Sequence, residues 1–138
     1  MLSSIVPGSA EFDAFVAALT AAKLPTEDLF SEPFRYFCLD DVAWGGFGAG
    51  RDALIRSIVV KPEARGSGVG AALVEALAEH ARREGVERLW LLTNGSASFF
   101  ERLGWAPAER SAAPPDIAAS RQFSGLCPAS STLMVRAL

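Results

Sequence analysis

The apolar residues in the middle of the chain form two continuous runs separated by a spaced pattern. Residues 54–60 (LIRSIVV) and 88–93 (RLWLLT) are short, nearly continuous apolar runs, which are typical of buried strands. Between these runs, apolar residues recur at helical spacing, at Val69, Leu73, Val74, Leu77 and Ala81. Gly85 then ends the pattern, as glycine often ends a helix. The sequence therefore predicts a strand, a helix and a second strand in succession.

The first third of the chain predicts a helix and a pair of antiparallel strands. Residues 4–6 read as a short strand, and Ser9 is a helix cap before an apolar stripe of Phe12, Phe15, Val16 and Leu19. Residues 26–28 are able to cap a short second helix. Strands are expected at residues 34–39 and 42–48, joined by a turn at Asp40-Asp41. The glycines of the second strand, Gly45, Gly46 and Gly48, indicate close packing or a bulge.

The last third of the chain predicts short elements and a final strand. The expected order is a cap at residues 94–96, a helix at 97–103 ended by Gly104, an extended piece from 105, a loop at 112–116, one or two helical turns within 117–123 and a strand at 131–137. We find no internal repeat and no domain boundary. The order of elements therefore predicts an α/β fold with one mixed sheet, in a single domain covering residues 1–138.

Composition and charge exclude several classes of function. The chain has 138 residues, half of them hydrophobic, and a net charge of −3, whereas a general nucleic-acid binder is basic. No apolar run approaches the ~20 residues that span a bilayer, and the first residues do not resemble a secretory signal. We therefore expect a cytoplasmic protein that acts on neither nucleic acid nor membrane. Cys38 and Cys127 lie far apart from each other and from the single histidine, His80, so no metal site is expected.

The stretch ARGSGVG, between the strand at 54–60 and the helix that follows, has the composition of an anion site. The first N–H groups of a helix lack partners and carry the positive end of its dipole. Glycines let that backbone approach a ligand, and Arg65 adds a positive charge. Ligand binding is thus favoured over a purely structural turn. The nucleotide P-loop pattern is absent, and residues 88–93 do not lead to the acidic residue of a dinucleotide site.

These residues resemble a known family. RGSGVG at residues 65–70 resembles the acetyl-CoA loop R/Q-x-x-G-x-G/A of the GCN5-related N-acetyltransferases, the GNAT superfamily. IRSIVVKPEARGSGVG is similar to that family's fourth strand and pyrophosphate loop, and LLTNGSASFFERLGW to its fifth strand and following helix. The strong match covers residues 53–105. The end of the chain, PPDIAASRQFSGLCPASSTLM, resembles small bacterial acetyltransferases associated with arsenic resistance, which are related to amino-acid N-acetyltransferases.

The resemblance implies a fold, a co-substrate and a reaction. The fold is a GNAT-like acyl-CoA N-acyltransferase fold, in which a central, mostly antiparallel sheet is flanked by helices and strands four and five splay apart. The pantetheine arm of acetyl-CoA would lie between these strands, and the acetyl group would pass directly to the primary amine of a small-molecule acceptor. No metal is implied, and a homodimer is compatible with the family.

The resemblance also implies site residues. The N–H of Val60 would polarise the thioester carbonyl, with Ser57 as a second catalytic candidate. Arg56 and Thr93 would lie on the acceptor side. The residues expected to bind acetyl-CoA are Ile58, Val59, Val60, Arg65, Gly66, Ser67, Gly68, Val69, Gly70, Ala71, Asn94, Ser96, Phe99 and Phe100.

The chain departs from the family pattern at two positions. Many members place a tyrosine where this chain has Phe100, and many carry a carboxylate in strand four, where residues 54–58 have none. Water, or a hydroxyl such as that of Ser57 or Thr93, could relay protons instead. Two alternatives to a small-molecule acetyltransferase therefore stay open: an acyl-CoA-binding domain without catalysis, and a protein lysine or N-terminal acetyltransferase.

Arg56 is a charge in an otherwise apolar strand, which is costly unless the charge is paired. One interpretation is a cross-strand salt bridge or a head group that reaches solvent. The other is a clamp for an acceptor carboxylate, which predicts a small amino-acid-like acceptor. For the clamp, we expect Arg56 on the same strand face as Leu54, Ile58 and Val60. Cys127 could face the acceptor, although buried packing is the simpler interpretation.

Overall fold

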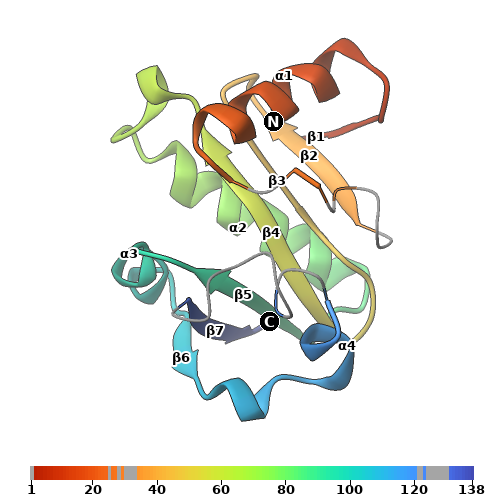
Figure 1. Ribbon diagram of the computed structural model, residues 1–138, viewed down its shortest axis with the longest axis vertical. Helices are drawn as coiled ribbons and strands as arrows, with labels where there is room; N and C mark the ends of the chain where they lie inside the picture. Colours follow the sequence, from red (N-terminus) through yellow and green to blue (C-terminus); the bar gives the residue numbers. More distant parts are fainter. Residues whose placement is uncertain (1, 25, 28, 30–33, 121–122, 124–130) are drawn as a thin grey trace.

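The computed structural model describes residues 2–24, 26–27, 29, 34–120, 123 and 131–138, and the account below concerns these residues (Figure 1). The strands are β1 (Leu2–Ile5), β2 (Arg35–Leu39), β3 (Ala43–Phe47), β4 (Asp52–Val60), β5 (Arg88–Thr93), β6 (Ala106–Ala108) and β7 (Thr132–Ala137). The helices are α1 (Ala10–Ala21), α2 (Val69–Arg83), α3 (Ala97–Arg102) and α4 (Pro115–Ala118), with short 3₁₀ turns at Pro62–Ala64 and Arg110–Ala112.

The strands in the described part of the chain form one mixed sheet of seven strands in the order β1-β2-β3-β4-β5-β7-β6. Every neighbouring pair is antiparallel except β4 and β5, which are parallel. The core clusters place α2 and α3 on one face of the sheet and α1 and α4 on the other. This arrangement confirms the predicted mostly antiparallel sheet flanked by helices. No helix in the described residues is long and apolar enough to cross a membrane.

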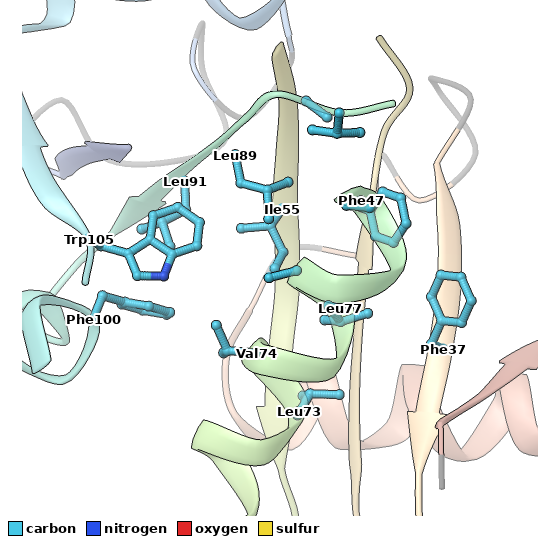
Figure 2. Packing of buried hydrophobic residues seen from close by; sticks show 14 of the residues in the cluster. Phe37, Phe47, Ile55, Leu73, Val74, Leu77, Leu89, Leu91, Phe100 and Trp105 are labelled. Atoms are coloured by element: carbon cyan, nitrogen blue, oxygen red, sulfur yellow. The ribbon is translucent and has the colours of Figure 1, made fainter. Parts of the chain in front are cut away.

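The largest core cluster lies between α2 and the sheet (Figure 2). Leu73, Val74 and Leu77 of α2 are fully buried there. They belong to the stripe that the sequence predicts, and they pack against strand residues such as Phe47 and Ile55. Burying a side chain of this size stabilises a fold by about 1.5–3 kcal/mol, so this stripe fixes α2 against β3 and β4.

The helix α1 covers the opposite face and begins where the sequence predicts. The backbone N–H of Phe12 donates a hydrogen bond to the side-chain oxygen of Ser9, 3.2 Å away, so Ser9 caps the helix. Phe15 and Leu19 are fully buried in a cluster with Tyr36 and other strand residues.

The prediction for the C-terminal third is only partly correct. The expected loop at 112–116 instead contains the end of a 3₁₀ turn and the start of α4 at Pro115. Proline is favourable at the first helical position, because the first N–H groups of a helix lack partners anyway. The short helix expected after the cap at residues 26–28 would fall mostly on residues outside the described part of the chain. Asp28 and Cys127 lie outside the described residues, as does the LCPASS motif apart from Ser131.

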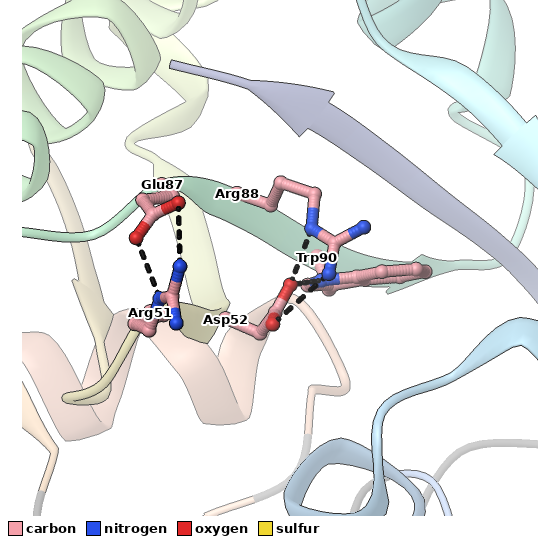
Figure 3. Close-up of polar contacts among 5 residues, drawn as sticks. All are labelled: Arg51, Asp52, Glu87, Arg88 and Trp90. Atoms are coloured by element: carbon pink, nitrogen blue, oxygen red, sulfur yellow. Dashed lines mark hydrogen bonds and ion pairs between the residues drawn. The ribbon is translucent and has the colours of Figure 1, made fainter.

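The parallel pair β4–β5 is closed at one end by an ion pair. Asp52 accepts hydrogen bonds from Nε of Arg88, 2.7 Å away, and from the indole N–H of Trp90, 2.9 Å away (Figure 3). Arg51 and Glu87 form a more exposed pair beside it. Burial acts to raise the pKa of the Asp52 carboxyl, but the hydrogen bonds from Arg88 and Trp90 outweigh it. The pKa of this carboxyl is therefore lower than usual.

We expect Asp52→Asn to lower the free energy of unfolding by about 1–2 kcal/mol at neutral pH, because the charged hydrogen bonds are lost. The pKa of Asp52 is lower in the folded state than in the unfolded state. Its contribution is therefore complete above the unfolded pKa and is lost as the pH falls through the folded pKa. Urea unfolding at a series of acidic pH values should show the wild type and the variant converging.

Glu87→Gln is the matched control, because its pair with Arg51 is exposed to solvent and screened. Its effect at neutral pH should be clearly smaller than that of Asp52→Asn. An equal effect of the two substitutions would show that the Asp52 ion pair does not close the base of the β4–β5 pair.

Candidate functional site

The strands β4 and β5 pair at one end and separate at the other. Their ladder covers only Asp52–Leu54 of β4 and Arg88–Trp90 of β5. Beyond it, β4 continues along β3 to Val60, and β5 stays paired with β7 to Thr93. Each strand thus follows its other neighbour and the two diverge (Figure 1), which confirms the predicted splayed strands. We call the opening between them the fork.

A bulge bends β4 at the fork. Ser57 has a φ of 58°, and it lies with Ile58 opposite the single residue Gly45 of β3. A Cβ at Gly45 would lie 2.5 Å from Cδ1 of Ile58, so any larger residue in the facing strand would force this side chain to shift. The glycines of residues 42–48 therefore indicated a bulge correctly, although the extra residue belongs to β4.

The bulge changes which residues share a face of β4. Leu54 and Val59 belong to clusters on the α1 and α4 side, whereas Ile58 and Val60 pack against the α2 cluster. The expectation that Arg56 shares a face with Ile58 and Val60 is therefore wrong. The expectation that Arg56 shares a face with Leu54 is correct. Strict alternation fails because the extra residue shifts the period by one position.

A cavity of about 760 Å³ opens at the fork and is lined by residues from both faces of the sheet. Eight of the predicted site residues line it: Arg56, Ser57, Ile58, Thr93, Asn94, Ser96, Phe99 and Phe100. Apolar side chains such as Ile58 and Phe100 belong to the α2 side. Val59, Val60 and the loop 65–71 are outside the cavity wall. Another cavity, of about 900 Å³, lies beside β1 and α2 and contains none of the predicted site residues.

Arg56 lies in the cavity wall with only 3% of its surface exposed, so the interpretation in which its head group reaches solvent is wrong. Its Nε donates a hydrogen bond to the side-chain oxygen of Ser57, 2.9 Å away. Its guanidinium carbon lies 5.0 Å from the centre of the Phe34 ring. A buried guanidinium on the α1 side of the sheet can recognise a planar anion such as a carboxylate.

The backbone of Val60 faces the fork. In an antiparallel pair, successive residues alternately direct their N–H and C=O groups toward the partner strand and away from it. The N–H of Lys61 donates to the carbonyl of Val42 at 2.8 Å, on the β3 side. The N–H of Val60 is therefore directed away from β3, toward the opening. The carbonyl of Val60 accepts a hydrogen bond from Nε of Arg65, 3.1 Å away, so Arg65 is anchored at the edge of the fork.

The glycine loop leads directly into α2. Gly66 and Gly68 have φ values of 81° and 85°, which favour glycine, and side chains added there would meet no protein atom within 4 Å. Gly68 is the N-cap of α2, a helix of 15 residues. Open space in front of a helix N-terminus beside Arg65 fits a phosphate group.

The cavity contains a carboxylate that the sequence did not indicate. Phe100 stacks edge-on against Phe99 and Trp105 and has no proton to donate. Asp52 belongs to β4 but lies at its closed end, away from the fork. Among the described residues of the cavity wall, Glu27 is the only carboxylate. Lys23 and Ser131 also line the cavity, and neither was predicted as a site residue. Nothing in the local sequence marks these three residues, because their place in the site depends on the tertiary fold.

Comparison with known proteins identifies relatives of this chain. The Acetyltransferase (GNAT) family matches residues 11–105. An amino-acid acetyltransferase of Photorhabdus laumondii is 40% identical over 57 residues, which are 41% of this chain and 13% of that protein. The chain thus spans a small part of this relative.

Solved structures have the same fold at low sequence identity. N-acetylglutamate synthase from Neisseria gonorrhoeae, in complex with coenzyme A and N-acetyl-glutamate, has a TM-score of 0.79 at 18% identity. The match covers all of this chain and 35% of that chain. A putative acyl-CoA N-acyltransferase from Klebsiella pneumoniae has a TM-score of 0.73 at 22% identity, and the match covers all of this chain and 97% of that chain.

We expect Gly68→Ala to lower the free energy of unfolding by about 1–2 kcal/mol, because an L-residue resists the left-handed conformation that begins α2. Gly70→Ala is the matched control. Its added Cβ would make only an ordinary contact, 3.5 Å from Cζ of Phe99. We expect it to leave stability unchanged or raised by up to about 1 kcal/mol. Urea unfolding of both variants checks this, and equal losses would contradict it.

Proposed function

We propose that this chain, which belongs to the acetyltransferase (GNAT) family, transfers the acetyl group of acetyl-CoA directly to the primary amine of a small amino-acid-like acceptor. The observation that carries the proposal is the fork, with a cavity of about 760 Å³ between two diverging strands and a glycine loop at the end of β4. The protein relatives named above support an acyl-CoA reaction, and their names favour an amino-acid acceptor.

Acetyl-CoA would occupy the fork as an additional strand. Its pyrophosphate would accept hydrogen bonds from the N–H groups of residues 65–71, with the charge of Arg65 nearby. Its pantetheine arm would lie between β4 and β5 and contact Asn94, Ser96 and Phe99 in the cavity wall. The N–H of Val60, which is directed into the fork, would then bind the thioester carbonyl.

In the reaction, the neutral amine attacks the thioester carbon and the carbon–sulfur bond breaks. The N–H of Val60 stabilises the negative charge that develops on the carbonyl oxygen. The leaving thiolate needs a proton, which Phe100 cannot supply. Ser57 is our candidate, because it lines the cavity and its oxygen accepts the N–H of Arg56, which leaves the hydroxyl proton available for donation. Thr93, at the end of β5, brings a second candidate hydroxyl to the cavity wall.

Arg56 would bind the carboxylate of the acceptor. It lies on the α1 side of the sheet, where Lys23 also lines the cavity, whereas the α2 side is apolar. An anionic group of the acceptor would therefore be directed toward the α1 side and its amine toward the thioester. With two cations, Lys23 and Arg56, against one carboxylate, Glu27, in the described part of the wall, this polarity favours a small amino acid over a basic peptide.

The test of the proposal is release of the CoA thiol by the purified protein from acetyl-CoA. The acceptor panel holds common amino acids, glutamate analogues that include arsenic- and phosphorus-containing ones, and a basic peptide. We expect turnover with one class of small amino acid. If calorimetry showed binding of acetyl-CoA but no acceptor were turned over, the proposal would be contradicted and an acyl-CoA-binding domain favoured. The buried Phe100, which stands in place of a proton donor, would then explain the lack of catalysis. Turnover with the peptide alone would indicate a protein acetyltransferase.

A second prediction concerns Arg56. We expect Arg56→Ala to raise the KM for the amino-acid acceptor roughly ten- to hundredfold, because a charged hydrogen bond is lost, with little change in the KM for acetyl-CoA. The matched amine without the carboxylate should be used equally by both proteins. Arg51→Ala, at the closed end of the fork, is the control substitution. If Arg56→Ala raised the KM for both acceptors equally, the role of Arg56 would be structural and the carboxylate clamp would be refuted.

A further inference from the structure

An acceptor amine in its protonated form must lose one more proton during the reaction than the CoA thiolate can accept. Primary amines are largely protonated at neutral pH, and only the neutral form can attack a carbonyl. Over the whole reaction the nitrogen loses two protons. One of them ends on the CoA sulfur, so the other requires a separate acceptor. A positioned general base of this kind contributes about 10²–10⁴-fold to a rate.

The charged residues of the cavity wall suggest where that proton goes. In the described part of the wall, the charged side chains are Lys23, Glu27 and Arg56. The two cations cannot accept a proton in their charged forms. Glu27 lines the cavity and is exposed to solvent, and a glutamate side chain is a suitable proton acceptor in general base catalysis. It can therefore take a proton inside the cavity and return it to solvent.

The end of α1 directs the segment that carries Glu27 to the cavity. Lys23 has a φ of 58°, and the N–H of Leu24 donates to the carbonyl of Leu19 at 2.9 Å, which closes the helix end. Lys23, Leu24 and Glu27, which follow α1 in the sequence, all line the cavity. The helix α1 covers the face of β4 on which Arg56 lies over Phe34, and Glu27, which follows the end of α1, lines the same cavity as Arg56.

We propose that Glu27 is the general base that deprotonates the acceptor amine, an inference that rests on the proposed acetyltransferase function. The ammonium of the acceptor gives one proton to the Glu27 carboxylate and becomes a neutral amine. The amine forms the bond to the acetyl carbon, and the carbon–sulfur bond breaks. The nitrogen loses its second proton, the CoA thiolate gains a proton to become the thiol, and Glu27 releases its proton to water.

Other titratable groups are placed less well for this step. Asp52 is at the closed end of the fork, where it is bonded to Arg88 and Trp90. His80 is on α2 on the opposite face of the sheet, with its Nε2 2.7 Å from a carboxylate oxygen of Glu84. Cys38 is buried outside this cavity, and burial raises the pKa of its thiol.

The experiment compares kcat/KM of the wild type and of Glu27→Gln between about pH 6 and about pH 9, with acetyl-CoA and the amino acid that gives turnover. At neutral pH we expect kcat/KM of the variant to be at least about a hundredfold lower than that of the wild type. The loss should shrink as the pH rises, because more of the acceptor is already neutral. Glu27→Asp should retain part of the activity. Calorimetric binding of acetyl-CoA should be unchanged, since Glu27 is on the acceptor side.

Glu109→Gln is the control, an exposed glutamate outside the cavity wall, and its profile should match the wild type. A Glu27→Gln profile that equals the wild type, or that is lowered by one constant factor at every pH, would overturn the assignment of Glu27 and leave the acetyltransferase function intact. A wild type that turns over no acceptor would overturn both. The two failures are thus distinguished by the wild-type measurement.

Discussion

The separation of β4 from β5 is the constraint on which the rest of the site depends. Strands that part in the middle of a sheet leave backbone N–H and C=O groups without a partner strand, and such groups need other partners when they are buried. Here contacts within the fold keep the two strands apart. Asp52 fixes the closed end through Arg88 and Trp90, while β3 and β7 hold the other edges of the two strands. The open end is therefore kept available to an extended ligand that can supply the missing hydrogen bonds.

The bulge at Ser57 links the shape of the fork to its chemistry. An extra residue increases the local twist and bends β4, which helps the strand to leave β5. The same residue shifts the side-chain alternation, so that Arg56 faces α1 while Ile58 and Val60 face α2. The cavity consequently has a charged side and an apolar side. One backbone irregularity thus determines both the opening and its polarity.

The sequence predicts the elements better than the geometry between them. β4, β5 and α2 are recognisable because apolar runs and helical spacing reflect burial directly, and Ser9 is recognisable because capping is a local interaction. The face of Arg56 was predicted wrongly, because the bulge depends on the pairing of Ser57 and Ile58 with Gly45, some twelve residues away. Glu27 was missed for a similar reason, since only the packing of α1 against β4 brings its segment to the cavity. The fork itself was predictable only through the resemblance to a family.

The unfavourable features of β4 are concentrated at the cavity, which supports a functional reason for them. Ser57 adopts a left-handed conformation that costs an L-residue about 1–2 kcal/mol, and the adjacent Arg56 is a charge removed from water. At the closed end of the same strand, Asp52 is held by an ion pair and an indole hydrogen bond. If the central sheet were selected for stability alone, a regular strand with an apolar residue at position 56 and no bulge at position 57 would serve. The local strain is instead located where a hydroxyl and a guanidinium are presented to the fork, as expected when strain is retained for function.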